Sequence, residues 1–140
     1  MKPKLFLDTN VVIDVIARRE PFFEDSCEVL SLCETGKADG VVSAITFCTV
    51  SYVLRKFSTA DALRHQIRDL RNTLPPVDLT ASLLDKAISS TIVDFEDAVQ
   101  FYSAVYTDAD FIITRNAKEF PQDGIPVLSP TAFLQLNLIK

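Results

Sequence analysis

The chain of 140 residues is poor in the residue types on which several common binding sites depend. It contains three glycines, one histidine and three cysteines, and no tryptophan. Dinucleotide-binding fingerprints and phosphate-cradling loops need several glycines within one turn, whereas Gly36, Gly40 and Gly124 are scattered, so both are excluded. The lone His65 excludes a multi-histidine zinc site and disfavours a histidine-based catalytic triad. The cysteines form no Cys-x-x-Cys pair, which argues against a zinc cluster or a disulfide framework and is typical of a reducing compartment.

Long apolar runs are also missing. The first residues, MKPKLFLD, reach an aspartate too early for the hydrophobic region of a signal peptide. No later run approaches the roughly 18 apolar residues of a transmembrane helix. We therefore expect a soluble, cytoplasmic protein with no membrane association. The composition, 48% hydrophobic and 24% charged, is typical of a globular core, and the length predicts a single domain over residues 1–140.

Acidic residues outnumber basic ones, and the formal net charge is −5. This balance argues against attraction of the whole molecule to nucleic acid, because like charges repel. The excess is local, however. Without Asp8, Asp94, Glu96 and Asp97, the remaining acidic and basic residues almost balance. Net charge alone therefore does not exclude a nucleic-acid substrate.

Short apolar strands alternate with helices along the whole chain. Strands are predicted at residues 5–7, 40–43, 77–79, 111–114 and 126–129. Helices are predicted at residues 11–17, 22–33, 46–56, 60–74, 80–87, 94–106 and 130–138. The alternation predicts an α/β domain with a largely parallel sheet.

In an open parallel sheet, ligands bind beyond the carboxyl ends of the strands. Asp8 directly follows the first predicted strand, and Asn116 lies two residues after the fourth, so both are expected at this edge. Asp108 and Asp110 precede the fourth strand and are expected at the opposite edge. We interpret these last two as solubilising turn residues.

Three further acids lie at the start of one predicted helix. Asp94 and Asp97 are three residues apart and share a face, whereas Glu96 is expected to point away from them. Asp94 also suits the N-cap of this helix, and Asp8 suits the N-cap of the helix that follows it, so a purely structural role stays open. Carboxylates without histidine or paired thiols match Mg²⁺ or Mn²⁺, which activate water and clamp phosphate oxygens in phosphodiester hydrolysis.

Three motifs, in order along the chain, together resemble the PIN domain family, and more narrowly its bacterial VapC-type toxins. They are LDTNVV at residues 7–12, DFEDA at 94–98 and ITRNxxEF at 113–120. The resemblance covers essentially the whole chain. It implies a three-layer α/β/α sandwich with a central, mostly parallel sheet. It also implies a metal-dependent endoribonuclease that cleaves RNA phosphodiester bonds as the toxin of a toxin–antitoxin pair. A small antitoxin protein and a homodimer are further implications.

The resemblance also assigns roles to individual residues. Asp8 and Asp97 would bind Mg²⁺ or Mn²⁺, and Asp94 would be an additional ligand. Asn116 stands at a position held by Asp or Asn in the family and completes the catalytic set. Candidate substrate contacts are the neighbours of this set and an arginine stripe spaced i, i+4, i+7 on a polar helix: Thr9, Asn10, Arg115, Arg64, Arg68 and Arg71. The stripe equally fits an ordinary solvated face.

One position departs from the family pattern. PIN domains usually carry a glutamate in a pattern like S-x-x-T-x-x-E after the second strand, and here Thr49 occupies its place. Asp14, Asp94 and Glu96 are the candidates to compensate. The alternative is a catalytically weakened or inactive PIN domain that serves as an RNA- or protein-binding module.

A third reading makes Asp8 the nucleophile of a phosphoaspartate enzyme or receiver domain. Phosphoaspartate enzymes normally carry the motif D-x-D, and here Asn10 occupies the position of the second aspartate. A receiver domain carries its phosphorylated aspartate after a middle strand, where this chain has Ser43. Both patterns disfavour this reading.

Overall fold

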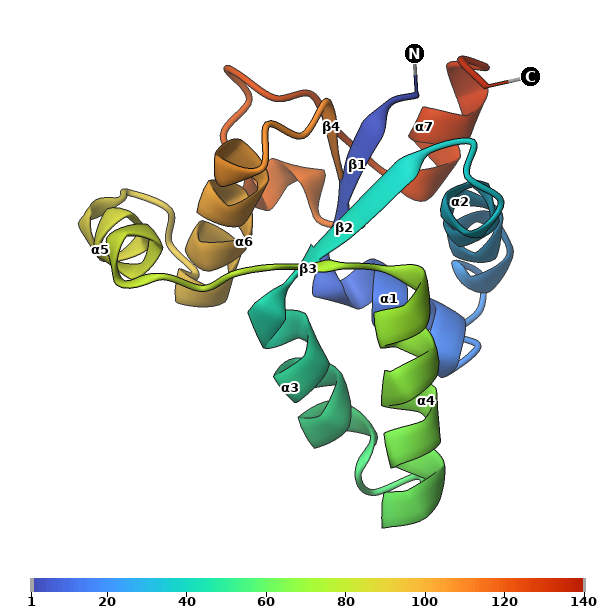
Figure 1. Ribbon diagram of the computed structural model, residues 1–140. Coiled ribbons are helices and arrows are strands. Elements are labelled where there is room, and N and C mark those ends of the chain that lie inside the picture. Colours follow the sequence, from blue (N-terminus) through green and yellow to red (C-terminus); the bar gives the residue numbers. More distant parts are fainter. Residues whose placement is uncertain (1, 140) are drawn as a thin grey trace.

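The computed structural model describes residues 2–139; Met1 and Lys140, the ends of the predicted single domain, lie outside the described residues. Its centre is a five-stranded sheet in the order β3-β2-β1-β4-β5, and every neighbouring pair of strands is parallel (Figure 1). The strands are β1 (Lys4–Leu7), β2 (Asp39–Ser43), β3 (Pro76–Val77), β4 (Phe111–Ile113) and β5 (Val127–Leu128). The predicted α/β class and parallel sheet are confirmed.

Each strand leads into helical structure. The helices are α1 (Thr9–Ile16), α2 (Phe23–Glu34), α3 (Ala44–Leu54), α4 (Ala60–Thr73), α5 (Ala81–Ser89), α6 (Phe95–Tyr106) and α7 (Pro130–Gln135), with a 3₁₀ turn η1 (Ala117–Glu119). Most begin at a residue whose side-chain oxygen accepts a backbone N–H of the first turn. These caps are Asp8, Ser43, Thr59, Thr80, Asp94 and Ser129.

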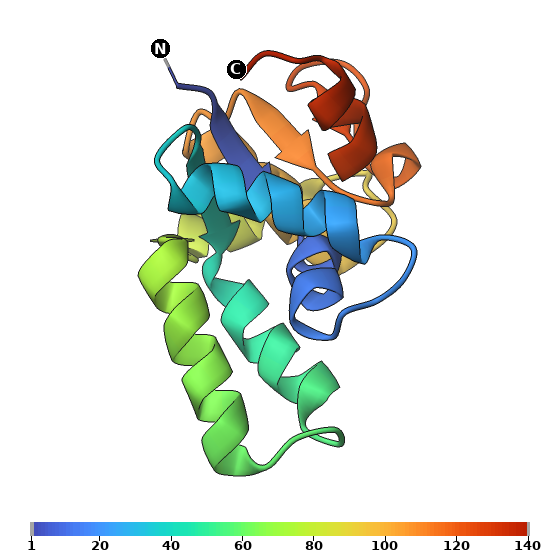
Figure 2. The same ribbon diagram turned by 90° about the vertical axis from the view of Figure 1, so that its right-hand side faces the viewer.

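The sheet separates two apolar layers because successive side chains of a strand point to opposite faces. Leu5 and Leu7 of β1 pack in one core with side chains of α1, α2, α4 and α7. Phe6, between them, packs on the other side with Ile112 and with Ala104 of α6. Figure 1 shows α5 and α6 on one side of the sheet and α2 on the other, and Figure 2 shows α2 and α7 in front of it. The predicted three-layer α/β/α sandwich is therefore confirmed.

The boundaries differ from prediction at a few points. The third strand pairs only at Pro76 and Val77 rather than over 77–79, because the chain turns away before the exposed Leu79. The helix after β2 begins at Ala44, two residues earlier than predicted, since Ser43 caps it directly. The short turn η1 was not predicted. Within residues 2–139, no helix combines the length and hydropathy needed to cross a bilayer.

Candidate active site

Asp8 is fixed at the carboxyl end of β1. Its backbone N–H donates to the carbonyl of Ile113 at 2.9 Å, which ties it to the end of β4. Its Oδ2 accepts a hydrogen bond from the hydroxyl of Thr114 at 2.7 Å, and its Oδ1 accepts one from the N–H of Thr9 at 2.7 Å. The residue is 5% exposed. Because both oxygens are held, the orientation of this buried carboxylate is fixed by Thr9, at the start of α1, and Thr114, just after β4.

A cavity of about 280 Å³ opens above Asp8 and is acidic. It is lined by residues from α1 and the loop after it, from α3, from the start of α6 and from the segment after β4. They are Asp8, Thr9, Asn10, Ile13, Arg19, Thr49, Asp94, Glu96, Asp97 and Asn116. The structure thus brings together the four residues of the predicted catalytic set. We call this cavity the acidic pocket.

The opposite edge of the sheet carries Asp108 and Asp110, the two acids that were predicted to be solubilising turn residues. Asp110 accepts a hydrogen bond from the backbone N–H of Lys4, at the beginning of β1, at 2.7 Å. Asp108 is exposed in the turn before it, with a φ of 56°. Both therefore lie at the amino ends of the strands, as predicted.

The start of α6 carries two of the predicted ligands. Asp94 caps the helix, since its Oδ1 accepts a hydrogen bond from the N–H of Asp97 at 2.9 Å. Asp94 also lines the acidic pocket. The capping role and the proximity to the pocket are therefore compatible, because the helix begins at the pocket wall.

Glu96 does not point away from the pocket, and that prediction was wrong. It lines the same cavity as Asp94 and Asp97, and its Oε1 accepts a hydrogen bond from the hydroxyl of Thr49 on α3 at 3.1 Å. The prediction assumed that residues on opposite faces of α6 cannot contact the same cavity. At the first turn, however, the pocket wraps around the end of the helix, and a long side chain can reach it from the far face.

Burial, with repulsion between the acids, changes the protonation of Asp97. The pKa of Asp97 is raised from 3.8 to about 7, mainly because the carboxyl group is withdrawn from water. Like charges nearby add to the shift, in decreasing order those of Asp8, Asp94, Glu119 and Glu96. The site therefore disfavours its own full ionisation, and a bound cation would relieve the repulsion.

The pKa of Asp8 is also raised, again chiefly by burial. The hydrogen bonds from Thr114 and Thr9 oppose the shift because they stabilise the carboxylate. Among the described residues, no lysine or arginine forms an ion pair with the carboxylates of the acidic pocket. The negative charge of the pocket is therefore not neutralised by direct ion pairs, although Arg19 is among the lining residues.

The donor atoms of the pocket suit a hard divalent cation. Its ionisable acids provide carboxylate oxygens, the ligand type that Mg²⁺ and Mn²⁺ prefer. No histidine or cysteine is among its lining residues. In residues 2–139, no three acidic, histidine or cysteine side chains form a ready-made metal cage. The donor chemistry of the lining residues nevertheless fits such an ion.

A buried polar layer supports the floor of the pocket. The hydroxyl of Thr9 lies 2.9 Å from that of Thr46, and it accepts a hydrogen bond from Nε2 of Gln100 at 2.9 Å. Gln100 is fully buried, and its Oε1 has no hydrogen-bond partner among the described residues. Sequence analysis missed Gln100, although it follows Asp97 by three residues and so shares its helix face. The hydroxyl of Thr9, a predicted substrate contact, is engaged in this layer.

Arg115 and Asp14 form an ion pair beside the pocket. Arg115 Nε lies 2.5 Å from Asp14 Oδ2 and Nη2 lies 3.2 Å from Oδ1, while the guanidinium stacks on Phe22 at 4.1 Å. The backbone N–H of Arg115 donates to Oδ1 of Asn10 at 3.3 Å. Neither charged residue of the pair lines the acidic pocket. The pair braces the loop that carries Asn116.

The remaining predicted contacts lie on α4. Arg64, Arg68 and Arg71 are exposed there but do not line the acidic pocket. Arg19, which no motif marks, does line it. Its position depends on the path of the loop after α1, and sequence analysis missed it for that reason. The positive charge nearest the pocket mouth is therefore not in the predicted stripe.

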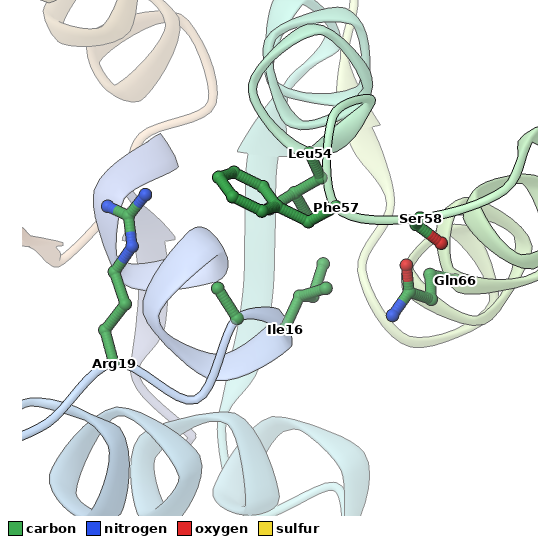
Figure 3. Close-up of a pocket in the computed structure, with 7 residues that line it drawn as sticks. Ile16, Arg19, Leu54, Phe57, Ser58 and Gln66 are labelled. Carbon is green, nitrogen blue, oxygen red and sulfur yellow. The ribbon is translucent and has the colours of Figure 1, made fainter.

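A second cavity of about 410 Å³ adjoins this region and shares Arg19 with the acidic pocket. It is largely apolar and lies between the ends of α1 and α3, the loop after α3 and the middle of α4 (Figure 3). Its lining residues are Ile16, Ala17, Arg19, Leu54, Phe57, Ser58 and Gln66. The side chain of Phe57 is 80% exposed, which is unusual for a large aromatic residue. We call this cavity the apolar cavity.

Comparison with known proteins gives consistent matches. The family model described as PIN domain matches residues 4–118. The chain is 28% identical to ribonuclease VapC1 of Aquifex aeolicus (strain VF5) over 137 residues, which covers 94% of each chain. Its structure is similar to that of VapBC2 from Rickettsia felis, solved bound to a DNA fragment from their promoter, with a TM-score of 0.65 and 17% identity over 90% of this chain and 97% of that one. It is also similar to the structure of FitAcB from Neisseria gonorrhoeae, with a TM-score of 0.61 and 17% identity over 91% of this chain and 98% of that one.

Proposed function

The chain belongs to the PIN domain family, and from that membership we propose that it is a metal-dependent endoribonuclease acting as the toxin of a toxin–antitoxin pair. The observation that carries the proposal is the acidic pocket, in which Asp8 and Asp97 meet at the carboxyl ends of the strands with raised pKa values. The similarity to a protein named ribonuclease VapC1 supports RNA as the substrate.

In this proposal each residue of the pocket has a distinct task. Asp8 and Asp97 would hold Mg²⁺ or Mn²⁺, with Asp94 as a further oxygen donor. The ion would supply an activated water molecule and neutralise charge on the scissile phosphate. Thr114 keeps the Asp8 carboxylate oriented. Asn116, exposed at the rim, would donate its amide to a phosphate oxygen, and Arg19 would attract the RNA backbone to the pocket mouth.

The metal requirement can be measured with the purified protein and a labelled RNA. We expect cleavage with Mn²⁺ present, none after chelation, and a loss of about a hundredfold or more in Asp8→Asn, because the amide removes a charge from the ion site. Asp108→Asn is the matched control. It removes an exposed acid at the other end of the sheet, where asparagine tolerates the positive φ. Cleavage that persists in both chelator and Asp8→Asn would contradict the proposal.

We further propose that a small antitoxin protein covers the apolar cavity. The support is the exposed ring of Phe57 above Leu54 and Ile16, next to the acidic pocket. A partner with an apolar helix would bury these side chains and close the pocket mouth.

Co-expression with a candidate antitoxin tests the antitoxin proposal. We expect the two proteins to co-purify, and Phe57→Glu to reduce the recovered partner about tenfold, since a charge would be buried in an apolar contact. Tyr52→Glu is the control, because Tyr52 is 65% exposed on α3, the helix that precedes Phe57, but does not line the cavity. Equal recovery with both variants would refute the proposed location.

The predicted homodimer is retained as part of the proposal. Large apolar side chains are exposed on and between α5 and α6, at one side of the molecule (Figure 1). Ile88 is 67% exposed, Val93 97% and Tyr106 66%. Contact between two such surfaces would remove them from water. This side is separate from the apolar cavity, so a dimer and an antitoxin could bind together.

Thr49 supports a second candidate function, a PIN domain that binds RNA without cleaving it. A hydroxyl stands on α3 where the family pattern carries a glutamate, and Asn116 is also uncharged. The cleavage assay separates the two functions. Retention of RNA without product, with Mn²⁺ present, would favour the binding module.

A further inference from the structure

The wall of the acidic pocket formed by α3 carries no acid. The helix, with the sequence AITFCTVSYVL, contains neither aspartate nor glutamate. Thr46 and Thr49 lie one turn apart on it. Thr46 is fully buried and contacts the hydroxyl of Thr9, whereas Thr49 is half-buried and lines the pocket. A carboxylate on this wall must therefore come from another element.

Glu96 places its carboxylate against that wall. The hydroxyl of Thr49 donates to its Oε1 at 3.1 Å, across 47 positions of sequence and from α3 to α6. Among the described residues, no lysine or arginine forms an ion pair with Glu96. Without such a hydrogen bond, the like charges of the other pocket acids would drive a flexible carboxylate into solvent. Thr49 thus holds Glu96 on the wall where the family pattern places an acid.

The other candidates for compensation are committed elsewhere. Asp14 is fully buried in its ion pair with Arg115 and does not line the pocket. Asp94 lines the pocket, but it caps α6 through Oδ1 and is already counted among the proposed ligands, so it does not replace an acid on α3. Glu119 acts on the charge of Asp97 from η1 but is likewise not a lining residue. Among the acids that the structure describes, only Glu96 combines a place in the pocket with a hydrogen bond from Thr49.

We propose that Glu96, held by Thr49, supplies the metal-binding carboxylate that α3 lacks. This inference rests on the proposed function and deepens it. Moving the acid from α3 to α6 keeps the number of negative charges around the ion, and ligand charge is one of the quantities that set cation affinity. Thr49 is then a positioning residue rather than a sign of lost activity.

Mn²⁺ binding to the purified protein, measured by titration calorimetry, tests the proposal without relying on cleavage. We expect Glu96→Gln to weaken Mn²⁺ binding about tenfold or more, because a ligand loses its charge. Glu119→Gln is the matched control, since it removes a charge that also acts on Asp97 but lies outside the pocket lining. It should weaken binding much less. Thermal unfolding of each metal-free variant verifies that it is folded.

Two further variants separate ligation from a general charge effect. Thr49→Val should weaken Mn²⁺ binding in the wild-type background but not in the Glu96→Gln background, because Thr49 acts only through Glu96. Combining Thr49→Glu with Glu96→Gln should restore most of the lost affinity by returning the acid to α3. Cleavage by the variants should follow the same order as affinity.

The possible failures are distinguishable. If Mn²⁺ binding is lost in Asp97→Asn but unchanged in Glu96→Gln, the role of Glu96 is overturned and the proposed function stands. Equal losses in Glu96→Gln and Glu119→Gln also overturn it, because they would show a general charge effect. If the wild-type protein binds no Mn²⁺ saturably, the proposed function and this inference both fall.

Discussion

Replacing Asp97 by asparagine is expected to lower RNA cleavage by about a hundredfold or more and, without metal ions, to stabilise the folded protein at about pH 8. The two effects have one cause. Burial and neighbouring like charges raise the pKa of Asp97 from 3.8 to about 7. The ionised carboxylate of Asp97 therefore destabilises the metal-free folded protein, whereas the same negative charge would bind a divalent ion. Asparagine removes the repulsion and the ligand together.

The sign of the pH dependence follows from proton binding. Between about pH 4 and pH 7, the folded chain keeps a proton on Asp97 that the unfolded chain releases. The free energy of unfolding contributed by this group therefore falls as pH rises through that window, and it stays low above it. Asp97→Asn lacks this titration, so its stability advantage should grow from about pH 4 to about pH 8.

Urea unfolding in the presence of a chelator measures this advantage at each pH. Asp108→Asn provides the control, because its carboxyl group is exposed at the far edge of the sheet. Added Mn²⁺ should reverse the order of stability at about pH 8, since ligand binding to the folded state favours the wild type. A metal-free Asp97→Asn protein less stable than wild type at about pH 8 would show that burial and neighbouring charges do not destabilise the ionised Asp97 in the folded state.

Replacing Arg115 by alanine is expected to lower the free energy of unfolding by about 3 kcal/mol. The substitution leaves the carboxylate of Asp14, which is 0% exposed, without its two hydrogen bonds from the guanidinium. Most of the effect comes from this stranded charge rather than from the attraction lost. Removing both partners should therefore cost much less than removing Arg115 alone.

Chemical denaturation of Arg115→Ala, Asp14→Asn and the double variant measures this coupling as a double-mutant cycle. Arg68→Ala, an exposed arginine on α4, is the control and should change stability by only a few tenths of a kcal/mol. If the double variant is as unstable as the sum of the single ones, the two side chains act independently. The stranded-charge explanation would then be wrong.

Much of the site could be predicted from the sequence because apolar runs and parallel pairing fix where the strands end. Asp8 and Asn116 lie in the acidic pocket, and Asp110 lies at the opposite edge. These positions follow from chain topology alone. Their roles in metal binding and catalysis remain predictions that the variants above address.

The features of the site that could not be predicted from the sequence depend on how the helices and loops pack in three dimensions. Glu96 reaches the pocket around the end of a helix, which a projection along the helix axis cannot represent. Arg115 pairs with Asp14 across 101 positions, so its guanidinium is committed beside the pocket, whereas sequence analysis considered it only as a phosphate contact. Arg19 arrives through an irregular loop. Each case requires knowing where separate elements pack, which local patterns do not contain.

Two acids of the pocket also begin helices. Asp8 accepts the N–H of Thr9 at the start of α1, and Asp94 accepts that of Asp97 at the start of α6. An apolar substitution at either position would remove a helix cap, at a cost of about 1 kcal/mol, together with an ion ligand. A lineage that lost catalysis would therefore retain asparagine, serine or threonine at these positions. The evolutionary drift of this site is constrained by folding even after selection for cleavage ends.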